Sequence, residues 1–149
     1  MSEPLEVVDP PELGRPQGYA NGILVPAGRQ LLFVAGQIAW DAGQRLVSDD
    51  FVEQFARALT NVLTVVDAAG GEAADVARLT VYVVDRAEYV ASRRELRGRW
   101  HELMGSHYPA MALVEVSGLL APGAKVEIEA TAAIPAHRAA AATERPDTD

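Results

Sequence analysis

The chain has 149 residues, of which 49% are hydrophobic and 23% are charged, and it contains no cysteine. This composition is typical of one globular domain, and it excludes wholesale disorder, a disulfide scaffold, a thiolate metal site and a cysteine nucleophile. The formal net charge of −8 argues against non-specific binding to nucleic acid or to an anionic membrane. No apolar run approaches the roughly 20 residues that span a bilayer, and the N-terminus lacks a signal-peptide pattern, so we expect a cytoplasmic protein.

Both ends of the chain differ from its middle. Residues 1–16 hold four of the nine prolines, and residues 135–149 are rich in alanine and then in charged residues. We expect both segments to be poorly ordered tails, although the alanine run could form a short helix. The folded domain is then expected over residues 17–134.

Two apolar runs at the start of this domain predict paired strands. The runs cover residues 22–25 and 30–38, and the segment between them, Pro26 to Arg29, contains turn-forming residues. This pattern predicts a β-hairpin.

An amphipathic helix is predicted next. Asp50 and Glu53 have the spacing of a helix-capping pair, and apolar residues then recur every three or four positions as far as Val66. Gly70 and Gly71 are expected to end the helix, because glycine accepts the left-handed conformation that follows many helices.

The second half of the domain adds three strands and one helix. Residues 79–84 are β-branched and aromatic, which favours a strand, and Asp85 with Glu88 predicts the start of a second helix. Residues 110–116 and 125–134 are predicted strands, and the last of them alternates apolar and polar positions.

The predicted element order is therefore β-β-α-β-α-β-β. Two helices cannot cover both faces of a sheet of this size, so we expect an α+β domain with both helices on one face of a mixed sheet. The other face carries Glu127 and Glu129 on the last strand, and it must find a partner. It could line a cleft or an oligomer interface.

Strong catalytic and metal-binding motifs are absent from the sequence. His101 and His107 are six residues apart, which does not place them on one helix face, so no metal is expected. The two glutamates could be a solvated sheet face, or in a cleft one of them could orient and deprotonate a water molecule. Residue types alone do not decide between these roles.

A basic cluster surrounds Glu95 on the second predicted helix and consists of Arg93, Arg94, Arg97 and Arg99. Such a cluster is usually a solvated helix face. Arg93 differs, because it lies four residues after Tyr89 and therefore on the apolar stripe of the helix. A guanidinium there needs a partner or an anionic ligand, or it must reach solvent at the edge.

Five stretches together resemble the RidA/YjgF family. They are Gly18 to Gly22, Ala35 to Gln37, Ala69 to Gly71 with Asp75-Val76, Thr80 to Asp85, and Pro109-Ala110 through Val114 to Val116 into Val126 to Ala130. The resemblance covers roughly residues 16–134 in order. It implies a chorismate-mutase-like α+β domain that assembles as a homotrimer, with clefts between subunits. It also implies hydrolysis of reactive enamines and imines to a 2-keto acid and ammonia, without a metal or organic cofactor.

The resemblance also implies roles for particular residues. The water-orienting glutamate of the family corresponds to Glu127, and Tyr19 and Gly36 correspond to positions that shape the cleft. The sequence departs from the family at Met111, where imine-deaminating members have an arginine that binds the substrate carboxylate; a thioether cannot replace it. Leu113 is likewise more apolar than the usual residue. We hypothesise that Arg93 supplies the missing cation from a different wall.

Two functions are compatible with these residues. The first is an enzyme that binds a small imine, enamine or related carbonyl compound between subunits, with Glu127 activating water and with a substrate other than 2-aminoacrylate. The second is a non-catalytic trimer that binds a small molecule or a protein client, as a regulator or chaperone-like particle. A nuclease role is the weakest candidate, because the chain is acidic and no aromatic residues accompany a basic groove.

Overall fold

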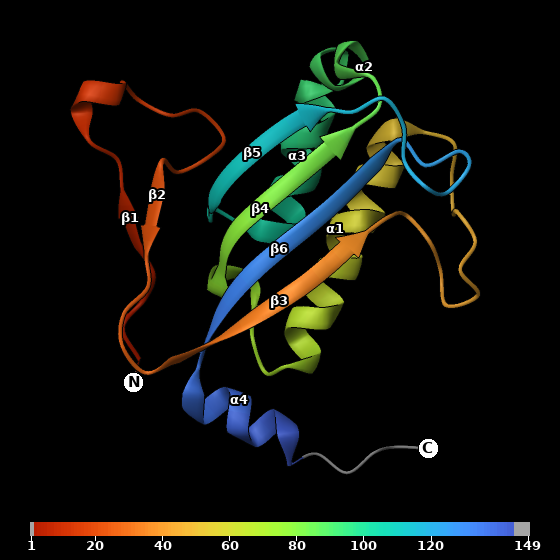
Figure 1. Cartoon of the computed structure of the whole chain (residues 1–149). Coiled ribbons are helices and arrows are strands. Elements are labelled where there is room, and N and C mark those ends of the chain that lie inside the picture. Colours follow the sequence, from red (N-terminus) through yellow and green to blue (C-terminus); the bar gives the residue numbers. More distant parts are fainter. Residues whose placement is uncertain (1, 145–149) are drawn as a thin grey trace.

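The computed structural model describes residues 2–144 and consists of a four-stranded sheet with helices on one face (Figure 1). The sheet order is β3-β6-β4-β5, in which only β4 and β5 are parallel. The elements are β1 (Glu6–Val8), a 3₁₀ turn (Pro11–Leu13), β2 (Gly22–Leu24), β3 (Arg29–Gln37), α1 (Phe51–Ala68), a second 3₁₀ turn (Ala73–Asp75), β4 (Val76–Val83), α2 (Arg86–Ala91), α3 (Arg93–Met104), β5 (Ala110–Glu115), β6 (Val126–Pro135) and α4 (Ala136–Thr143).

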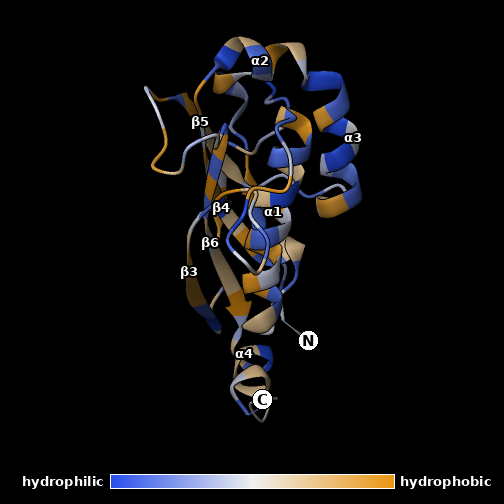
Figure 2. Cartoon of the chain, turned by 90° about the vertical axis from the view of Figure 1, so that its right-hand side faces the viewer, coloured by the Kyte–Doolittle hydropathy of each residue, from blue (hydrophilic) through white to orange (hydrophobic). Residues whose placement is uncertain are grey.

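The hydrophobic core lies between the sheet and the helices α1 and α3, which pack against one another (Figure 2). From Leu79 to Val83 in β4 and from Val126 to Ala132 in β6, alternate side chains are buried in this layer, as the alternating sequence predicts for β6, whereas the last four residues of β6 are all buried. The predicted α+β class with a mixed sheet is therefore confirmed. None of the helices within residues 2–144 is long and apolar enough to cross a membrane.

The predicted helix starts are confirmed by their hydrogen bonds. The Asp50 carboxylate accepts from the backbone N–H of Glu53 at 3.0 Å, and the Asp85 carboxylate accepts from the first turn of α2. Gly70 follows α1 with φ +87°, the conformation expected of a terminating glycine. The second predicted helix is divided in two at Ser92, which ends α2 and precedes α3.

The predicted hairpin over residues 22–38 is wrong. β2 pairs with β1 in a separate two-stranded sheet, in which Leu24 lies opposite Glu6, whereas β3 pairs with β6. The turn residues after β2 lead the chain into β3 rather than back onto β2. The pairing of β3 with β6 begins at the first residue of β3, where Arg29 lies opposite Pro135 and its side chain forms a buried ion pair with Asp75.

Both segments expected to be tails contain short elements of regular structure. Residues 1–16 include β1, and α4 begins directly after β6 at the base of the sheet, which agrees with the alternative of a short alanine-rich helix (Figure 1). Residues 145–149 of the second segment lie outside the described residues.

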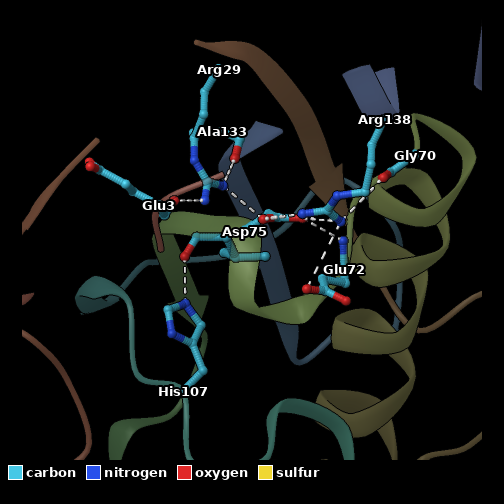
Figure 3. Close-up of polar contacts among 9 residues, drawn as sticks. Glu3, Arg29, Gly70, Glu72, Asp75, His107, Ala133 and Arg138 are labelled. Atoms are coloured by element: carbon cyan, nitrogen blue, oxygen red, sulfur yellow. Dashed lines mark hydrogen bonds and ion pairs between the residues drawn. The ribbon is translucent and has the colours of Figure 1, made fainter. Parts of the chain in front are cut away.

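A buried carboxylate links these terminal elements to the domain (Figure 3). Asp75, at the end of the second 3₁₀ turn, is 2% exposed and forms ion pairs with Arg29 at 2.8 Å and with Arg138 of α4 at 3.0 Å. Arg29 also donates to the backbone carbonyls of Ala133 and Glu3. A single aspartate thus connects β3, β6, α4 and the N-terminal segment, because two guanidinium groups converge on it.

Candidate functional site

A cavity of about 470 Å³ opens between the helices α2 and α3 and the edge strand β5. Its volume falls in the range of roughly 300–1,000 Å³ that is typical of small-molecule sites. The lining residues combine aromatic, aliphatic and cationic side chains, and they are Gln17, Gly18, Phe55, Tyr89, Arg93, Leu96, Arg97, Trp100, Tyr108, Met111 and Leu113.

The periodicities of one helix and one strand create this lining. Arg93, Arg97 and Trp100 lie three to four residues apart on α3, so one side of the helix presents all of them to the cavity. On β5, Met111 and Leu113 alternate with exposed residues and pair with the buried face of β4. Three of the predicted site residues, Arg93, Met111 and Leu113, therefore share one cavity.

Arg93 lies beside an aromatic ring in this cavity. Its guanidinium carbon is 5.8 Å from the centroid of the Tyr89 ring, within the range of a cation–π contact. No ion pair within residues 2–144 involves Arg93, whereas Arg99 on the same helix pairs with Glu53 and Glu102. Arg93 is exposed, so its charge reaches solvent at the edge of the helix stripe and is free to act on a ligand in the cavity.

Glu127, the predicted catalytic residue, is not part of the lining of this cavity. Glu127 and the buried residues Val126 and Ile128 point to opposite faces of β6, so Glu127 lies on the face of the sheet that the helices leave uncovered (Figure 2). A Cβ atom added at Gly36 would lie 2.8 Å from the carboxyl carbon of Glu127. The carboxylate therefore lies directly over Gly36, and any side chain at that position would displace it.

The two glutamates of this face have different surroundings. Glu129 accepts a hydrogen bond of 2.7 Å from the hydroxyl of Tyr82 on β4, and this hydrogen bond raises the pKa of Tyr82 above its usual value of 10.0. No hydrogen bond among the described residues involves the Glu127 side chain, which is half-buried. Glu129 is therefore committed to a neighbour, while Glu127 can bind water or a ligand.

Tyr19 is not among the residues that line the cavity, although its neighbour in sequence, Gly18, is. It is 41% exposed, between Gly18, which lines the cavity, and Ala20, whose N–H donates to the carbonyl of Pro109 at 3.0 Å. This backbone contact holds the segment against the start of β5. The six predicted residues thus form two groups on opposite sides of the sheet, which a single chain does not bring together.

Within the described part of the chain, no group of three or more histidine, cysteine or acidic side chains could hold a metal ion. His107 has a structural contact: its Nε2 lies 2.7 Å from the carbonyl oxygen of Val76. Its own carbonyl accepts a hydrogen bond from the Trp100 indole at 3.2 Å, which fixes the orientation of that ring in the cavity wall.

Among the lining residues that were not predicted for the site, three bear on its chemistry, namely Arg97, Trp100 and Tyr108. The sequence pattern places Arg97 on a solvated helix face and Trp100 in the core stripe, and it gives Tyr108 no role. The signal is present for the first two, because Arg97 and Trp100 follow Arg93 at helical spacing. Tyr108 joins them only through folding: its ring stacks on Trp100 with centroids 5.6 Å apart and planes 4° from parallel.

Comparisons with known proteins agree with this architecture. The family described as Endoribonuclease L-PSP matches residues 15–134. Protein DfrA of Myxococcus xanthus is 36% identical over 115 residues, which are 76% of this chain and 83% of that protein. The 2-iminobutanoate/2-iminopropanoate deaminase of Capra hircus is 31% identical over 115 residues, which are 76% of this chain and 78% of the deaminase.

Solved structures show the same fold. The Rid-family protein YyfB of Yersinia pestis matches with a TM-score of 0.76 and 31% identity, over 89% of this chain and all of that one. The YjgF gene product of E. coli matches with a TM-score of 0.62 and 30% identity, over 83% of this chain and 91% of that one. Since the family match spans most of the chain and relatives above 30% identity share its fold, the chain belongs to the RidA/YjgF family.

Proposed function

We propose that the chain is a hydrolase that converts 2-imino acids or the related enamines to 2-keto acids and ammonia. The observation that carries this proposal is the Arg93 guanidinium, which shares a cavity with Met111 and has no ion pair among the described residues. The family resemblance implies an arginine at the position of Met111 that binds the substrate carboxylate, and Arg93 can supply that cation from the helix instead. Relatives named as 2-iminobutanoate/2-iminopropanoate deaminases, at 31% identity, support the reaction class.

In this reaction the oxygen of a water molecule adds to the imine carbon, while Glu127 accepts the proton of that water. The C=N double bond becomes a single bond, and its nitrogen takes up the proton that Glu127 accepted from the water. The new hydroxyl group then gives its own proton to the nitrogen, with Glu127 as the carrier, and the C–N bond breaks. The hydroxyl oxygen becomes the carbonyl oxygen of the keto acid, and the nitrogen leaves as ammonia. A carboxylate that is not hydrogen-bonded to another side chain is suited to accept and return these protons.

Glu127 and the cavity can act on one substrate only if two copies of the chain meet. The uncovered face of the sheet, which bears Glu127, exposes Phe33 by 76% and Leu31 by 59% on β3. Contact of this face with the cavity side of a neighbouring copy would bury these side chains and bring Glu127 opposite Met111. The homotrimer that the family resemblance implies is therefore part of the proposal. The proposal also keeps the expected cytoplasmic location and the absence of a cofactor.

The test is an imine-hydrolysis assay in which an amino-acid oxidase generates 2-imino acids and semicarbazide traps the surviving imine. We expect Glu127→Gln to lower kcat/KM by at least about 100-fold, the usual contribution of a general base. Glu129→Gln is the matched control, because that carboxylate lies on the same strand face but is bonded to Tyr82. Its kcat/KM is expected to stay within about threefold of wild type, the scale on which a single exposed hydrogen bond acts.

Two further variants separate binding from chemistry. Arg93→Ala is expected to raise KM while Met111→Arg restores a carboxylate-binding cation on β5. If the wild type does not hydrolyse imines, the proposed reaction is wrong and a binding or regulatory module is the remaining candidate, and hydrolysis by Met111→Arg alone would show that only the altered residue restores the reaction. The name of the matching family suggests ribonuclease activity, but a net charge of −8 disfavours binding to RNA.

A further inference from the structure

Helix α3 presents a second cation to the cavity. Arg97 lies one helical turn after Arg93, and both side chains line the cavity while remaining accessible to solvent. None of the ion pairs within residues 2–144 includes either of them. Arg94, the residue between them in the basic cluster, does not line the cavity. The helix therefore directs two uncompensated guanidinium groups at the same space.

The cavity lining also contains three aromatic rings, those of Tyr89, Trp100 and Tyr108, and the first two lie beside the arginines on α2 and α3. The Trp100 and Tyr108 rings are stacked, and the indole N–H already donates to the backbone carbonyl of His107, so the indole offers ring surface to a ligand while the two tyrosines also carry hydroxyl groups. Met111 lies on the strand side of the same space, where its thioether can contact an aromatic ring. A ligand that satisfies both the arginines and the rings has an anionic end and an aromatic body.

We propose that this cavity selects 2-imino acids with an aromatic side chain, together with the aryl 2-keto acids they yield. The carboxylate lies between Arg93 and Arg97, where charge-assisted hydrogen bonds from two guanidinium groups hold it. The aromatic side chain packs on the rings and against Met111. This inference rests on the proposed function, since it names the substrate class of that same site and adds Arg97 and Trp100 as specificity-determining residues.

The alternatives fit the cavity less well. A three- or four-carbon acid would reach the arginines but leave most of the roughly 470 Å³ to water. A neutral aromatic compound would pack on the rings but desolvate two guanidinium groups without giving them a partner, which is costly. Under this inference, Met111 on β5 provides an apolar contact for the aromatic ring of the ligand, where the family resemblance implies a cationic arginine.

Direct binding of stable 2-keto acids tests the inference without turnover. Phenylpyruvate, pyruvate and the neutral ketone 1-phenylpropan-2-one are titrated by calorimetry, and the quenching of tryptophan fluorescence, to which Trp40 and Trp100 both contribute, is followed in parallel. We expect phenylpyruvate to bind at least about tenfold more tightly than pyruvate and than the neutral ketone, because each of those lacks one of the two contacts. Equal affinity for phenylpyruvate and pyruvate would overturn the inference, and this comparison needs no variant.

Two arginine variants provide the matched comparison. Arg97→Ala is expected to weaken phenylpyruvate binding at least about tenfold, whereas Arg94→Ala is expected to change it by less than about twofold. Both residues are exposed on the same helix, so both variants should fold, as checked by circular dichroism. Similar affinities for the two variants would refute the role of Arg97.

The outcome separates this inference from the proposed function. If the aryl preference and the Arg97 dependence hold but no imine is hydrolysed, the hydrolase proposal fails and the binding inference stands. If Glu127-dependent imine hydrolysis is found without any aryl preference, the hydrolase proposal stands and this inference fails.

Discussion

The buried carboxylate of Asp75 allows a sharp prediction about stability. The ion pair between Asp75 and Arg29 joins side chains that are 3% and 4% exposed, at 2.8 Å. Replacing Asp75 with asparagine keeps the shape of the side chain but removes its charge. Arg29 then remains buried, with only the backbone carbonyls of Ala133 and Glu3 as acceptors and with its Nε already lacking a hydrogen-bond partner in the described structure.

Removing one partner of a buried ion pair costs about 3–5 kcal/mol, because the remaining charge stays desolvated. Arg138 adds little to this loss, since its side chain is 31% exposed and can turn toward solvent. For a chain of this size, each kcal/mol corresponds to a shift in Tm of about 2–4 °C, so Asp75→Asn should lower the Tm by about 6–20 °C.

Urea unfolding followed by circular dichroism measures the effect as a change in the free energy of unfolding. Glu102→Gln is the control, because it removes an ion pair with Arg99 at 3.8 Å in which the glutamate is 65% exposed, and it should cost less than about 1 kcal/mol. The double variant with Arg29→Met should lose less than the sum of the two single variants. A loss for Asp75→Asn no larger than that of the control would refute the reasoning.

Three further predictions follow from single contacts. Gly36→Ala should displace the Glu127 carboxylate and lower kcat at least about tenfold in the imine assay, while the free energy of unfolding changes by less than about 1 kcal/mol because only a flexible side chain must move. An unchanged kcat would contradict the placement of the Glu127 carboxylate over Gly36. Tyr82→Phe should remove a loss of stability at alkaline pH, because the pKa of Tyr82 is raised beside Glu129 in the folded protein, so that this tyrosine ionises at a lower pH in the unfolded chain. The stability of the wild type should therefore fall above pH 10.0 relative to the variant, and an equal difference between their urea midpoints at pH 8 and above pH 10 would disprove this. Gly70→Ala should lower the free energy of unfolding by about 1–3 kcal/mol, because the φ of +87° disfavours a side chain and the new Cβ would meet the backbone of α4. Hydrogen exchange in α4 should become faster, and an unchanged exchange rate would argue against the contact.

Local signals in the sequence predicted the elements well. The caps at Asp50 and Asp85 and the glycine at position 70 occur where the structure starts and ends its helices, because each acts through hydrogen bonds or backbone angles within a few residues. The alternation of β6 likewise predicted which of its side chains are buried. The division between α2 and α3 at Ser92 had no such local signal, since neither glycine nor proline marks it.

The hairpin prediction failed because strand pairing is not a local property. A turn before residue 29 is compatible with pairing to the preceding strand or to a distant one. In the structure β3 pairs with β6, more than 100 residues away in the chain, and Arg29 contributes to this pairing through its buried ion pair with Asp75 and its hydrogen bond to the carbonyl of Ala133. No pattern within β2 or β3 encodes that contact.

The candidate site shows the same division. The sequence singled out Arg93 from its position on the apolar stripe, and the family resemblance drew attention to Met111 and Glu127. Only the fold revealed that Glu127 and the cavity occupy opposite faces of the sheet, and that Tyr108 stacks on Trp100 in the cavity lining.

The sequence by itself therefore determined most of the elements, the α+β class and the cationic side of one helix, because these properties depend on periodicity and capping, which act over a few residues. The family was indicated instead by the resemblance of five stretches to known sequences. The tertiary structure decided the partner of β3, the shared cavity of Arg93, Arg97 and Met111, and the separation of that cavity from Glu127. These depend on side chains from distant segments that meet only when the hydrophobic core has formed.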